Sequence, residues 1–292
     1  MAKIGLVTVL FKSDDVLEGF FKSIALQKYE AYVLYLIDNS ANAVTDELIN
    51  KLSLSYPVTA YQHIKNPGNV GVAAGNNTGI KLALKDGCTH VLLLNNDIEI
   101  EQDDVFSKLI SLYEDRGEMI VVPKIYYFDT RRLWMAGGYL DRWRALGVHF
   151  GYNKKDAEQY STSKYITYAP TCFMIIAREV FEKTGYMDEK YFAYYDDVDF
   201  VLRALRSGFR VYYDATINIL HKVSSSTGTA SPFYVYYSNR NKLYFIKKNF
   251  KGFRKYFAIA YTVASRMAFY IRYNSTKRKK LIAGLKDGFK MQ

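Results

Sequence analysis

The feature that most constrains this chain is a series of short, fully apolar segments that alternates with segments of helical periodicity in its first half. The apolar segments span residues 3–11, 32–38, 58–64 and 90–94. The helix-like segments lie near residues 17–26, 45–54 and 70–85. Strands that are apolar throughout are typical of parallel sheets covered by helices on both faces. We therefore predict an α/β fold with a Rossmann-like, mostly parallel sheet flanked by helices.

The second half continues this pattern less regularly. Residues 169–177 and 209–221 are again strand-like, and residues 178–184 and 196–207 have helical character. A chain of 292 residues that is 49% hydrophobic can bury a sizeable core. We expect residues 1–232 to form one domain and residues 233–292 to form a C-terminal helical extension rich in aromatic and basic residues.

Cysteine usage and hydropathy favour a cytoplasmic protein. Cys88 and Cys172 are the only cysteines, and their spacing fits neither a metal site nor a disulfide scaffold. Residues 1–5 lead directly into the first strand without the apolar stretch of a signal peptide. Residues 258–271 are too short to span a bilayer, which takes about 20 apolar residues, and Arg266 interrupts them.

Positive charge is concentrated in the C-terminal extension. The chain has a formal charge of +11, yet residues 233–292 alone hold 15 Lys and Arg against one acid, Asp287, so the first 232 residues carry −3. Fifteen aromatic residues are interleaved with these basic ones. Amphipathic helices of this composition suit an anionic membrane surface. A homodimer interface is the alternative, because aromatic helix faces also bury in oligomers.

A nucleic-acid partner is a third interpretation of basic residues interleaved with aromatic ones. The acidic body of the chain argues against it, so we expect no nucleic acid. We expect instead a peripheral location at the inner face of the cell membrane.

Three polar residues, Asn95, Asn96 and Asp97, follow the apolar strand 90–94 directly. In open α/β sheets, ligands bind beyond the carboxyl ends of the strands. A carboxylate at this edge can hold a divalent cation against a diphosphate. The alternative is a polar turn in which these side chains cap backbone groups.

Three acids, Asp196, Asp197 and Asp199, stand at the start of a predicted helix. A positioned carboxylate can act as a general base toward a hydroxyl. Helix capping and the helix dipole favour acids at the same place, so this pattern has a structural explanation as well.

Two further features are weak when taken alone. His221 ends the last predicted strand, where it is either structural or a ligand beside a carboxylate. Residues 66–79 form a glycine-rich helix start that allows close approach of a nucleotide, but Gly68, Gly71 and Gly75 do not follow a dinucleotide fingerprint.

Taken together and in order, these segments resemble glycosyltransferase family 2, which has the GT-A fold, and in particular its bacterial rhamnosyltransferase-like branch. The likeness covers about residues 3 to 245. It is carried by residues 8–11, 36–40, 69–71 with Asn76 and Gly79, 93–97, 185–189 with Phe192, 196–199 with Arg203, Gly208 and His221.

The resemblance implies roles for individual residues. Thr8 and Leu10 would line the nucleotide, and Asp38 would accept a hydrogen bond from the ring N–H of its base. The donor site would also include Asn69, Gly71, Asn76, Asn95 and Asn96. Asn95 and Asp97 occupy the outer places of the family's DXD motif, so Asp97 would bind Mn²⁺ or Mg²⁺ and His221 would complete that metal site.

The resemblance also implies the reaction. Asp196 and Asp197 match the family's Glu-Asp pair, with Asp197 as the expected general base. The expected reaction is a single inverting displacement from a nucleotide-sugar donor onto a hydroxyl. The branch favours dTDP-L-rhamnose, whereas UDP-hexoses use the same fold. The acceptor would be a surface polysaccharide or a lipid-linked saccharide. A sugar-phosphate nucleotidyltransferase is excluded, because residues 11–14 are not its Arg- and Lys-bearing glycine-rich loop.

Overall fold

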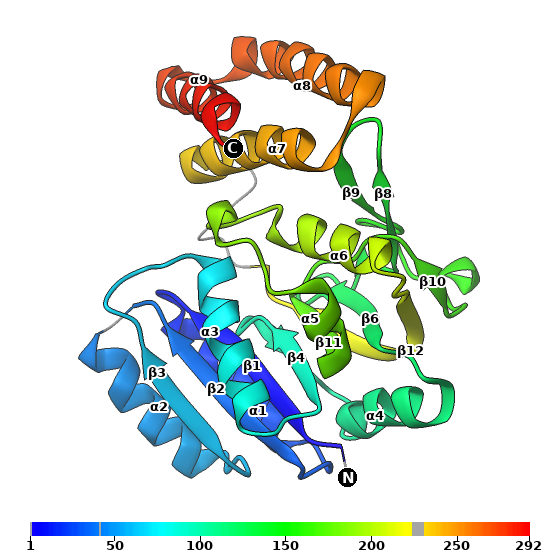
Figure 1. The fold of residues 1–292 in the computed structure, drawn as a ribbon. Helices are drawn as coiled ribbons and strands as arrows, with labels where there is room; N and C mark the ends of the chain where they lie inside the picture. Colours follow the sequence, from blue (N-terminus) through cyan, green and yellow to red (C-terminus); the bar gives the residue numbers. More distant parts are fainter. Residues whose placement is uncertain (1, 41, 224–230) are drawn as a thin grey trace.

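The computed structural model describes residues 2–40, 42–223 and 231–292 (Figure 1). One large sheet forms its centre, with the strand order β10-β12-β6-β11-β4-β1-β2-β3. Its strands are β1 (Ile4–Leu10), β2 (Tyr32–Asp38), β3 (Tyr61–Lys65), β4 (His90–Leu94), β6 (Ile120–Tyr127), β10 (Lys164–Ile166), β11 (Phe173–Ala177) and β12 (Val211–His221). Two short strands, β5 (Ile98–Glu99) and β7 (Leu133–Met135), pair with β12 and β6.

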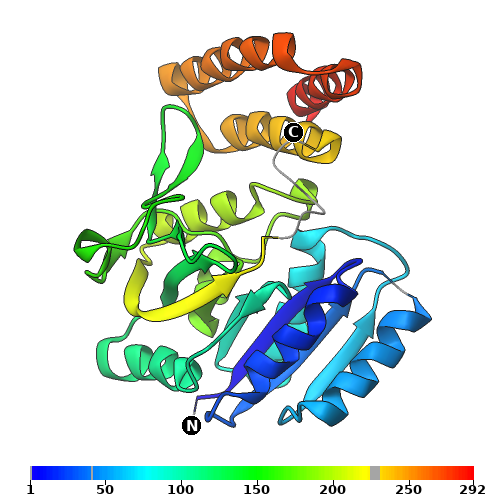
Figure 2. The same ribbon diagram turned by 180° about the vertical axis from the view of Figure 1, so that it is seen from behind.

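Helices cover both faces of the part of the sheet formed by β1 to β4. The helices of this part are α1 (Leu17–Ala25), α2 (Ala43–Ser55) and α3 (Val72–Lys85). In Figure 1, α3 lies in front of β1 and β2, and Figure 2 shows α1 and α2 on the other face. β1, β2 and β4 are apolar at almost every position because both of their faces are buried. The apolar strand expected at residues 58–64 is instead β3, which lies at the edge of the sheet and has no buried residue. This arrangement confirms the α/β fold predicted from the sequence.

The direction of the strands changes halfway across the sheet. β3, β2, β1 and β4 run parallel, whereas β11 is antiparallel to both of its neighbours, β4 and β6. β12 then runs parallel to β6. As a result the start of β11 and the ends of β4 and β12 meet at one edge of the sheet. The remaining elements of this half are the helices α4 (Val105–Arg116), α5 (Arg178–Thr184) and α6 (Asp196–Arg206) and the short helices η2 (Glu158–Tyr160) and η3 (Glu189–Tyr191). The short helix η1 (Asp14–Val16) lies between β1 and α1.

A hairpin of β8 (Gly138–Asp141) and β9 (Leu146–His149) projects from the sheet edge toward the C-terminal helices (Figure 1). Its base lies beside β7, and its tip reaches the last part of the chain. Trp143 at this tip makes an edge contact with the ring of Phe257, at 5.4 Å between ring centroids. The hairpin therefore links the sheet to the C-terminal extension.

The C-terminal extension folds into three helices, α7 (Pro232–Asn249), α8 (Gly252–Arg272) and α9 (Ser275–Lys290), at one end of the molecule (Figures 1 and 2). α9 crosses α7 closely at two glycines, because a Cβ at Gly284 or Gly288 would come within 2.5 Å of a carbonyl oxygen of α7. α7 in turn shares an apolar cluster with α6, in which Tyr195 and Leu202 contact Phe245 and its neighbours. Within the described residues, no helix has the length and apolar character needed to cross a membrane. The boundary at residue 232 stays a prediction.

Candidate functional site

Asp97 and His221 lie against each other at the edge where β4 and β12 end. Asp97 directly precedes β5, and β5 pairs antiparallel with the end of β12, where Ile98 is opposite His221. This pairing brings the imidazole Nε2 of His221 within 3.1 Å of the carboxylate Oδ1 of Asp97. Both residues are more than nine-tenths buried. The short strand β5 is thus the element that joins two residues 124 positions apart in sequence.

The donor atoms of this pair fit a divalent cation. Carboxylate oxygens suit Mg²⁺ and Mn²⁺, and an imidazole nitrogen adds a ligand that transition metals accept. Adjacent ligands of an octahedral ion with bonds of about 2.1 Å are about 3 Å apart, which is close to the separation of Asp97 and His221. The ring of His221 is held by Trp134, whose centroid lies 4.7 Å away in an edge-on contact.

A second group of possible metal ligands lies at the ends of β2 and β3. Asp38, Asp46 and His63 each offer a ligand atom, and these atoms lie within 4.8 Å of one another. Lys65, however, forms an ion pair with Asp46. The lysine ammonium already supplies positive charge to this carboxylate, so the donor set fits a cation less well than the pair of Asp97 and His221.

Asp196 and Asp197 stand at the first turn of α6, after a strained segment. Phe192, Tyr194 and Tyr195 have φ angles of 58°, 64° and 71°, in the left-handed region that bulky residues rarely adopt. Strain of this kind persists only where surrounding contacts hold it, and it often marks a functional site. The segment leads directly into the first turn of α6, where Asp196 is almost fully buried.

Burial changes the acidity of both aspartates. Burial and the neighbouring Asp197 carboxylate raise the pKa of Asp196 to about 7. Burial also raises the pKa of Asp197, while a hydrogen bond from the hydroxyl of Tyr168, at 2.8 Å to Oδ2, opposes that rise. Asp197 is therefore the member of the pair that stays ionised more readily near neutral pH, as a general base must.

The thiol of Cys172 shows that the two acidic groups share one region. Its pKa is raised by burial and by the charges of Asp97 and Asp197 together. Cys172 directly precedes the start of β11, and its carbonyl oxygen accepts a hydrogen bond from the backbone N–H of Asn95 at 2.9 Å. The antiparallel direction of β11 thus places Cys172 between the end of β4 and the start of α6.

A series of aromatic rings also connects these groups. Trp134 contacts both His221 and His149, with centroids 4.7 and 4.6 Å apart, and His149 stacks on Tyr168 at 5.8 Å. Burial lowers the pKa of His149 to about 4, so this imidazole is neutral at physiological pH. Tyr168 then holds Asp197 through its hydroxyl. The series joins the candidate metal ligand His221 to the candidate base.

The predicted nucleotide-binding residues gather at the carboxyl ends of β1 and β2. Leu10 is in register with Asp38 across the two strands, and Thr8 lies two residues before Leu10. All three side chains are almost fully buried. The Asp38 carboxylate accepts a hydrogen bond from the backbone N–H of Ser40 at 2.7 Å. His63 approaches its other oxygen at 3.4 Å.

The glycine-rich segment closes over these strand ends. The side-chain oxygen of Asn69 accepts hydrogen bonds from the backbone N–H of Gly71 at 2.9 Å and from the amide of Asn39 at 3.3 Å. Gly71 has a φ of 87°, and a Cβ there would lie 2.5 Å from the carbonyl oxygen of Phe192. Gly71 therefore lets the start of α3 touch the strained segment before α6.

Three predicted asparagines have different surroundings. Asn95 is exposed. The amide of Asn96 donates a hydrogen bond to the hydroxyl of Ser13. Asn76 points from α3 toward Met187, with its amide 3.6 Å from the sulfur, so it contacts the segment before η3 instead of the strand ends.

The strained segment is held by α7. Asn241, which is completely buried, donates from its amide nitrogen to the carbonyl oxygens of Tyr191, Ala193 and Tyr194 at 2.6, 2.7 and 2.9 Å. Arg240 fixes that amide by donating to its oxygen at 2.8 Å. A residue of the C-terminal extension thus supports the loop that carries Asp196 and Asp197.

The structure adds Tyr168, His149 and Asn241 to the site residues expected from the sequence. A single tyrosine or histidine at the border of a strand carries no spacing signal, so sequence reasoning could not select Tyr168 or His149. Asn241 belongs to the segment that resembles the family, but its three carbonyl partners are set by the fold alone.

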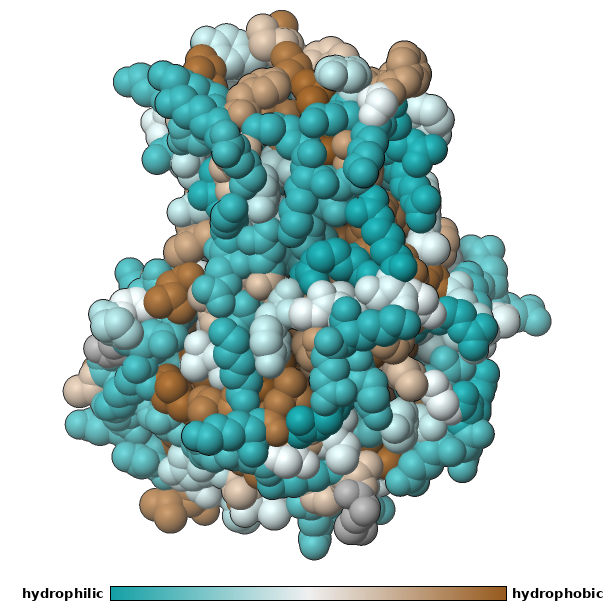
Figure 3. Space-filling view, viewed as in Figure 1, coloured by the Kyte–Doolittle hydropathy of each residue, from teal (hydrophilic) through white to brown (hydrophobic). Residues whose placement is uncertain are grey.

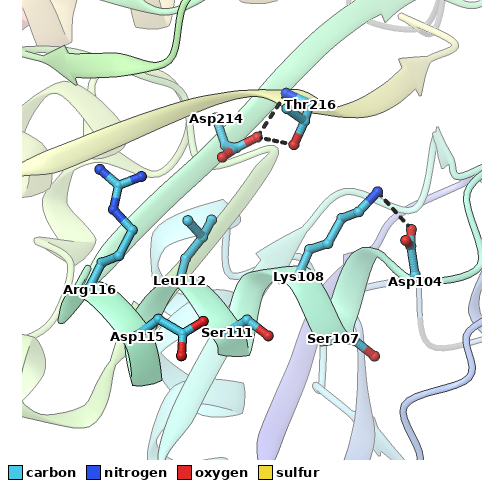
Figure 4. A pocket seen from close by; sticks show the side chains of 9 residues that line it. All are labelled: Asp104, Ser107, Lys108, Ser111, Leu112, Asp115, Arg116, Asp214 and Thr216. Carbon is cyan, nitrogen blue, oxygen red and sulfur yellow. Dashed lines mark hydrogen bonds and ion pairs between the residues drawn. The ribbon is translucent and has the colours of Figure 1, made fainter.

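A shallow hollow of ≈ 300 Å³ between α4 and β12 lies away from these residues (Figure 4). Asp214 and Thr216 from the start of β12 face Lys108 and Arg116 of α4. Its charges are largely engaged, as in the pair of Lys108 and Asp104. It contains none of the candidate residues.

The model of the family described as glycosyl transferase family 2 matches residues 6–185 of this chain. The chain belongs to this family. The family assignment made from the sequence is therefore confirmed, and the protein is a glycosyltransferase. The matched residues include the glycine-rich segment and Asp97, whereas Asp196, Asp197 and His221 lie beyond them.

Two relatives with assigned activities are similar to this family member. The low-salt glycan biosynthesis hexosyltransferase Agl10 of Haloferax volcanii is 24% identical over 244 residues, which cover 82% of this chain and 74% of the relative. The dTDP-rhamnosyl transferase RfbF of Shigella flexneri is 24% identical over 189 residues, which cover 62% of this chain and 61% of the relative.

Solved structures share the fold at low sequence identity. The mannosyltransferase PcManGT from Pyrobaculum calidifontis, in complex with GDP-Man and Mn²⁺, superposes with a TM-score of 0.61 at 12% identity, covering 98% of this chain and 86% of the other. TarS 1-349 of S. aureus, in complex with UDP-GlcNAc, has a TM-score of 0.66 at 12% identity and covers 99% of this chain and 81% of the other. These likenesses support the GT-A architecture.

Proposed function

We propose that this glycosyltransferase moves a sugar from a nucleoside diphosphate donor to a hydroxyl of a saccharide acceptor by a single, inverting displacement. The observation that carries the proposal is the position of Asp97, His221 and Asp197. The first two are 3.1 Å apart, and Asp97 and Asp197 both act on the thiol of Cys172. A metal-ligand pair and a carboxylate base near the same buried thiol fit a donor diphosphate and an attacking hydroxyl.

Each group has a defined part in the proposed reaction. Asp197 takes the proton of the acceptor hydroxyl as its oxygen attacks the anomeric carbon. The bond from that carbon to the diphosphate oxygen breaks, and the anomeric configuration is inverted. Asp97 and His221 would hold Mn²⁺ or Mg²⁺, which supplies charge stabilisation for the leaving diphosphate. Asp196, whose pKa is about 7, shares the pair's negative charge with Asp197.

The nucleoside would bind where the ends of β1 and β2 meet the glycine-rich segment. Thr8, Leu10 and Asp38 would contact the base, with the Asp38 carboxylate accepting from its ring N–H. Asn69 and Gly71 would form the other wall of this part of the site. Asn76, Asn95 and Asn96 remain predicted donor-site residues.

For the donor we propose dTDP-L-rhamnose, with a UDP-hexose as the second candidate. The likeness to the dTDP-rhamnosyl transferase RfbF supports the first, and the likeness to the hexosyltransferase Agl10 supports the second. The acceptor we propose is a growing surface polysaccharide or a lipid-linked saccharide on the cytoplasmic side of the cell membrane.

The test is release of the nucleoside diphosphate from a panel of dTDP-, UDP- and GDP-sugars with Mn²⁺, Mg²⁺ or EDTA. We expect one donor to be consumed only with metal. Asp97→Ala should lose metal-dependent donor binding, whereas Asp197→Asn should bind the donor and lose turnover. Asp115→Asn, at an exposed carboxylate of α4, is the matched control and should keep full activity. If calorimetry detects no binding of any nucleotide sugar or diphosphate, the proposal is wrong.

A further inference from the structure

We propose that the outward face of α8 docks flat on an anionic lipid membrane. α8 is 21 residues long, or about 31 Å at 1.5 Å per residue. Figures 1 and 2 place it at the extreme end of the molecule, with no element beyond it. Its inner side packs on α7, where Ala258 and Thr262 are buried and Arg266 donates to Asn239 at 2.6 Å.

The outer side of α8 carries an unbroken apolar row. Its members recur at intervals of four and three residues, which places them on one helical face. The row consists of Phe253, Phe257, Ala260, Ala264, Met267 and Ile271, and all six are exposed. Phe253 and Ile271, near its two ends, each keep 76% of their surface exposed. Figure 3 shows brown and tan residues at this end of the molecule, interspersed with hydrophilic residues in teal. No charged residue interrupts the row.

The basic residues around this row favour an anionic membrane over a second copy of the chain as the partner. Arg254 and Arg272 flank it, and the N-terminal half of α9 adds a cluster of basic residues at positions 277–280. The one acid of the extension, Asp287, accepts a hydrogen bond from the hydroxyl of Tyr236 at 2.8 Å. An apolar helix face bordered by Lys and Arg is the arrangement that binds acyl chains and anionic headgroups together. Two copies of the chain meeting through α8 would instead oppose two segments that each carry +14.

The hairpin β8–β9 extends the same surface. Trp143 at its tip is half-exposed, its ring lies against Phe257, and the guanidinium of Arg254 lies 5.3 Å from its centroid. Tryptophan prefers the level of the headgroups at a membrane surface. The other end of the hairpin is His149, which contacts Trp134 and Tyr168. A hairpin of four residues per strand spans about 13 Å, so the docked face and the candidate site would be close enough for a membrane-held acceptor.

The test is co-sedimentation of the full chain with vesicles, without donor or metal, so that its outcome does not depend on the proposed reaction. We expect binding to phosphatidylcholine vesicles that contain phosphatidylglycerol, at least tenfold weaker binding to phosphatidylcholine alone, and weaker binding at high salt. The double variant Phe253→Ser and Ile271→Ser should weaken binding at least tenfold. Val44→Ser with Leu54→Ser, on the exposed side of α2, is the matched control and should bind as the wild type does.

Three outcomes would overturn this inference. One is a wild-type chain that does not sediment with anionic vesicles, and another is a Phe253 and Ile271 variant that binds them unchanged. The third is a stable dimer in analytical ultracentrifugation that this double variant dissociates, because α8 would then bind a second copy. Circular dichroism of the variant must match the wild type, which the exposure of both side chains leads us to expect.

Discussion

Replacing Asn241 should release the loop that carries the two candidate catalytic aspartates. Its amide is completely buried and donates to three carbonyl oxygens between residues 191 and 194. In Asn241→Leu the carbonyl oxygens of Ala193 and Tyr194 lose this donor in a buried site, whereas the carbonyl oxygen of Tyr191 still accepts from the backbone N–H of Ala193 and from Arg240. A buried carbonyl left without a partner costs about 1–3 kcal/mol, and the amide has two hydrogens to share, so we expect a loss of about 2–4 kcal/mol in the free energy of unfolding.

The same substitution should affect activity more than stability explains. Three residues of the segment hold left-handed φ angles, which cost about 1–2 kcal/mol each. The three hydrogen bonds from Asn241 act as a clamp on this segment. Without the clamp the segment rearranges and relieves the strain, and Asp197 moves away from Tyr168. We expect kcat to fall at least tenfold at a temperature where the variant is fully folded, with the affinity for the nucleoside diphosphate within twofold of the wild type.

The assay combines urea unfolding with kcat and donor binding, and Asn249→Leu is the matched control. Asn249 is also a buried amide on α7, but it bonds Asp199 and Arg206 and no carbonyl of the loop. The control should lose stability and keep kcat. Equal kcat losses in the two variants would show that kcat depends on the packing of α7 against α6 and not on the hydrogen bonds from Asn241 to the loop. A wild-type kcat in Asn241→Leu would refute the reasoning outright.

Three other substitutions test the site. Tyr168→Phe removes the hydrogen bond that opposes the raised pKa of Asp197, so the acidic limb of the kcat/KM profile should move about one pH unit upward, measured from pH 5 to 9. Asp196→Asn should stabilise the fold at neutral and higher pH. Because the pKa of Asp196 in the folded protein, about 7, lies above its ordinary value of 3.8, the wild type loses stability as the pH rises from about 4 to 7. In urea unfolding the variant should therefore be more stable than the wild type by up to about 4 kcal/mol at pH 8 and equally stable at pH 4. Gly71→Ala places a Cβ against the carbonyl of Phe192 at a φ of 87°, so thermal unfolding should show a loss of about 1–3 kcal/mol, with weaker diphosphate binding by calorimetry.

The parallel part of the fold could be predicted from the sequence because its signals are local. The strands predicted at 32–38 and 90–94 have the bounds that the structure gives to β2 and β4. Continuous apolar runs specify buried strands without reference to the rest of the chain. The antiparallel direction of β11 has no such signal, because a buried strand has the same apolar pattern whether it pairs parallel or antiparallel with its neighbours.

The candidate site was predictable where a motif stands at the end of a strand, as at Asp97, and less so where the fold creates the contact. Nothing in the sequence links Asp97 to His221 except the likeness to the family, since β5 has only two residues. The hydroxyl of Tyr168 contacts Asp197 because β11 is antiparallel to β4, so the residues that precede β11 lie at the carboxyl end of β4. Each of these contacts depends on pairing between distant segments, which single-sequence patterns do not encode.

The clamp by Asn241 also sets the order in which this protein can become active. Tyr191 and Asn241 are 50 residues apart, and the helix that carries Asn241 is itself braced by α9 at the C-terminal end. Chains emerge from the ribosome from their N-terminus, so the nucleotide-binding strands can form well before this clamp exists. We therefore expect a nascent or prematurely terminated chain to acquire its donor site first and its base loop last. Such a chain would hold a donor without consuming it.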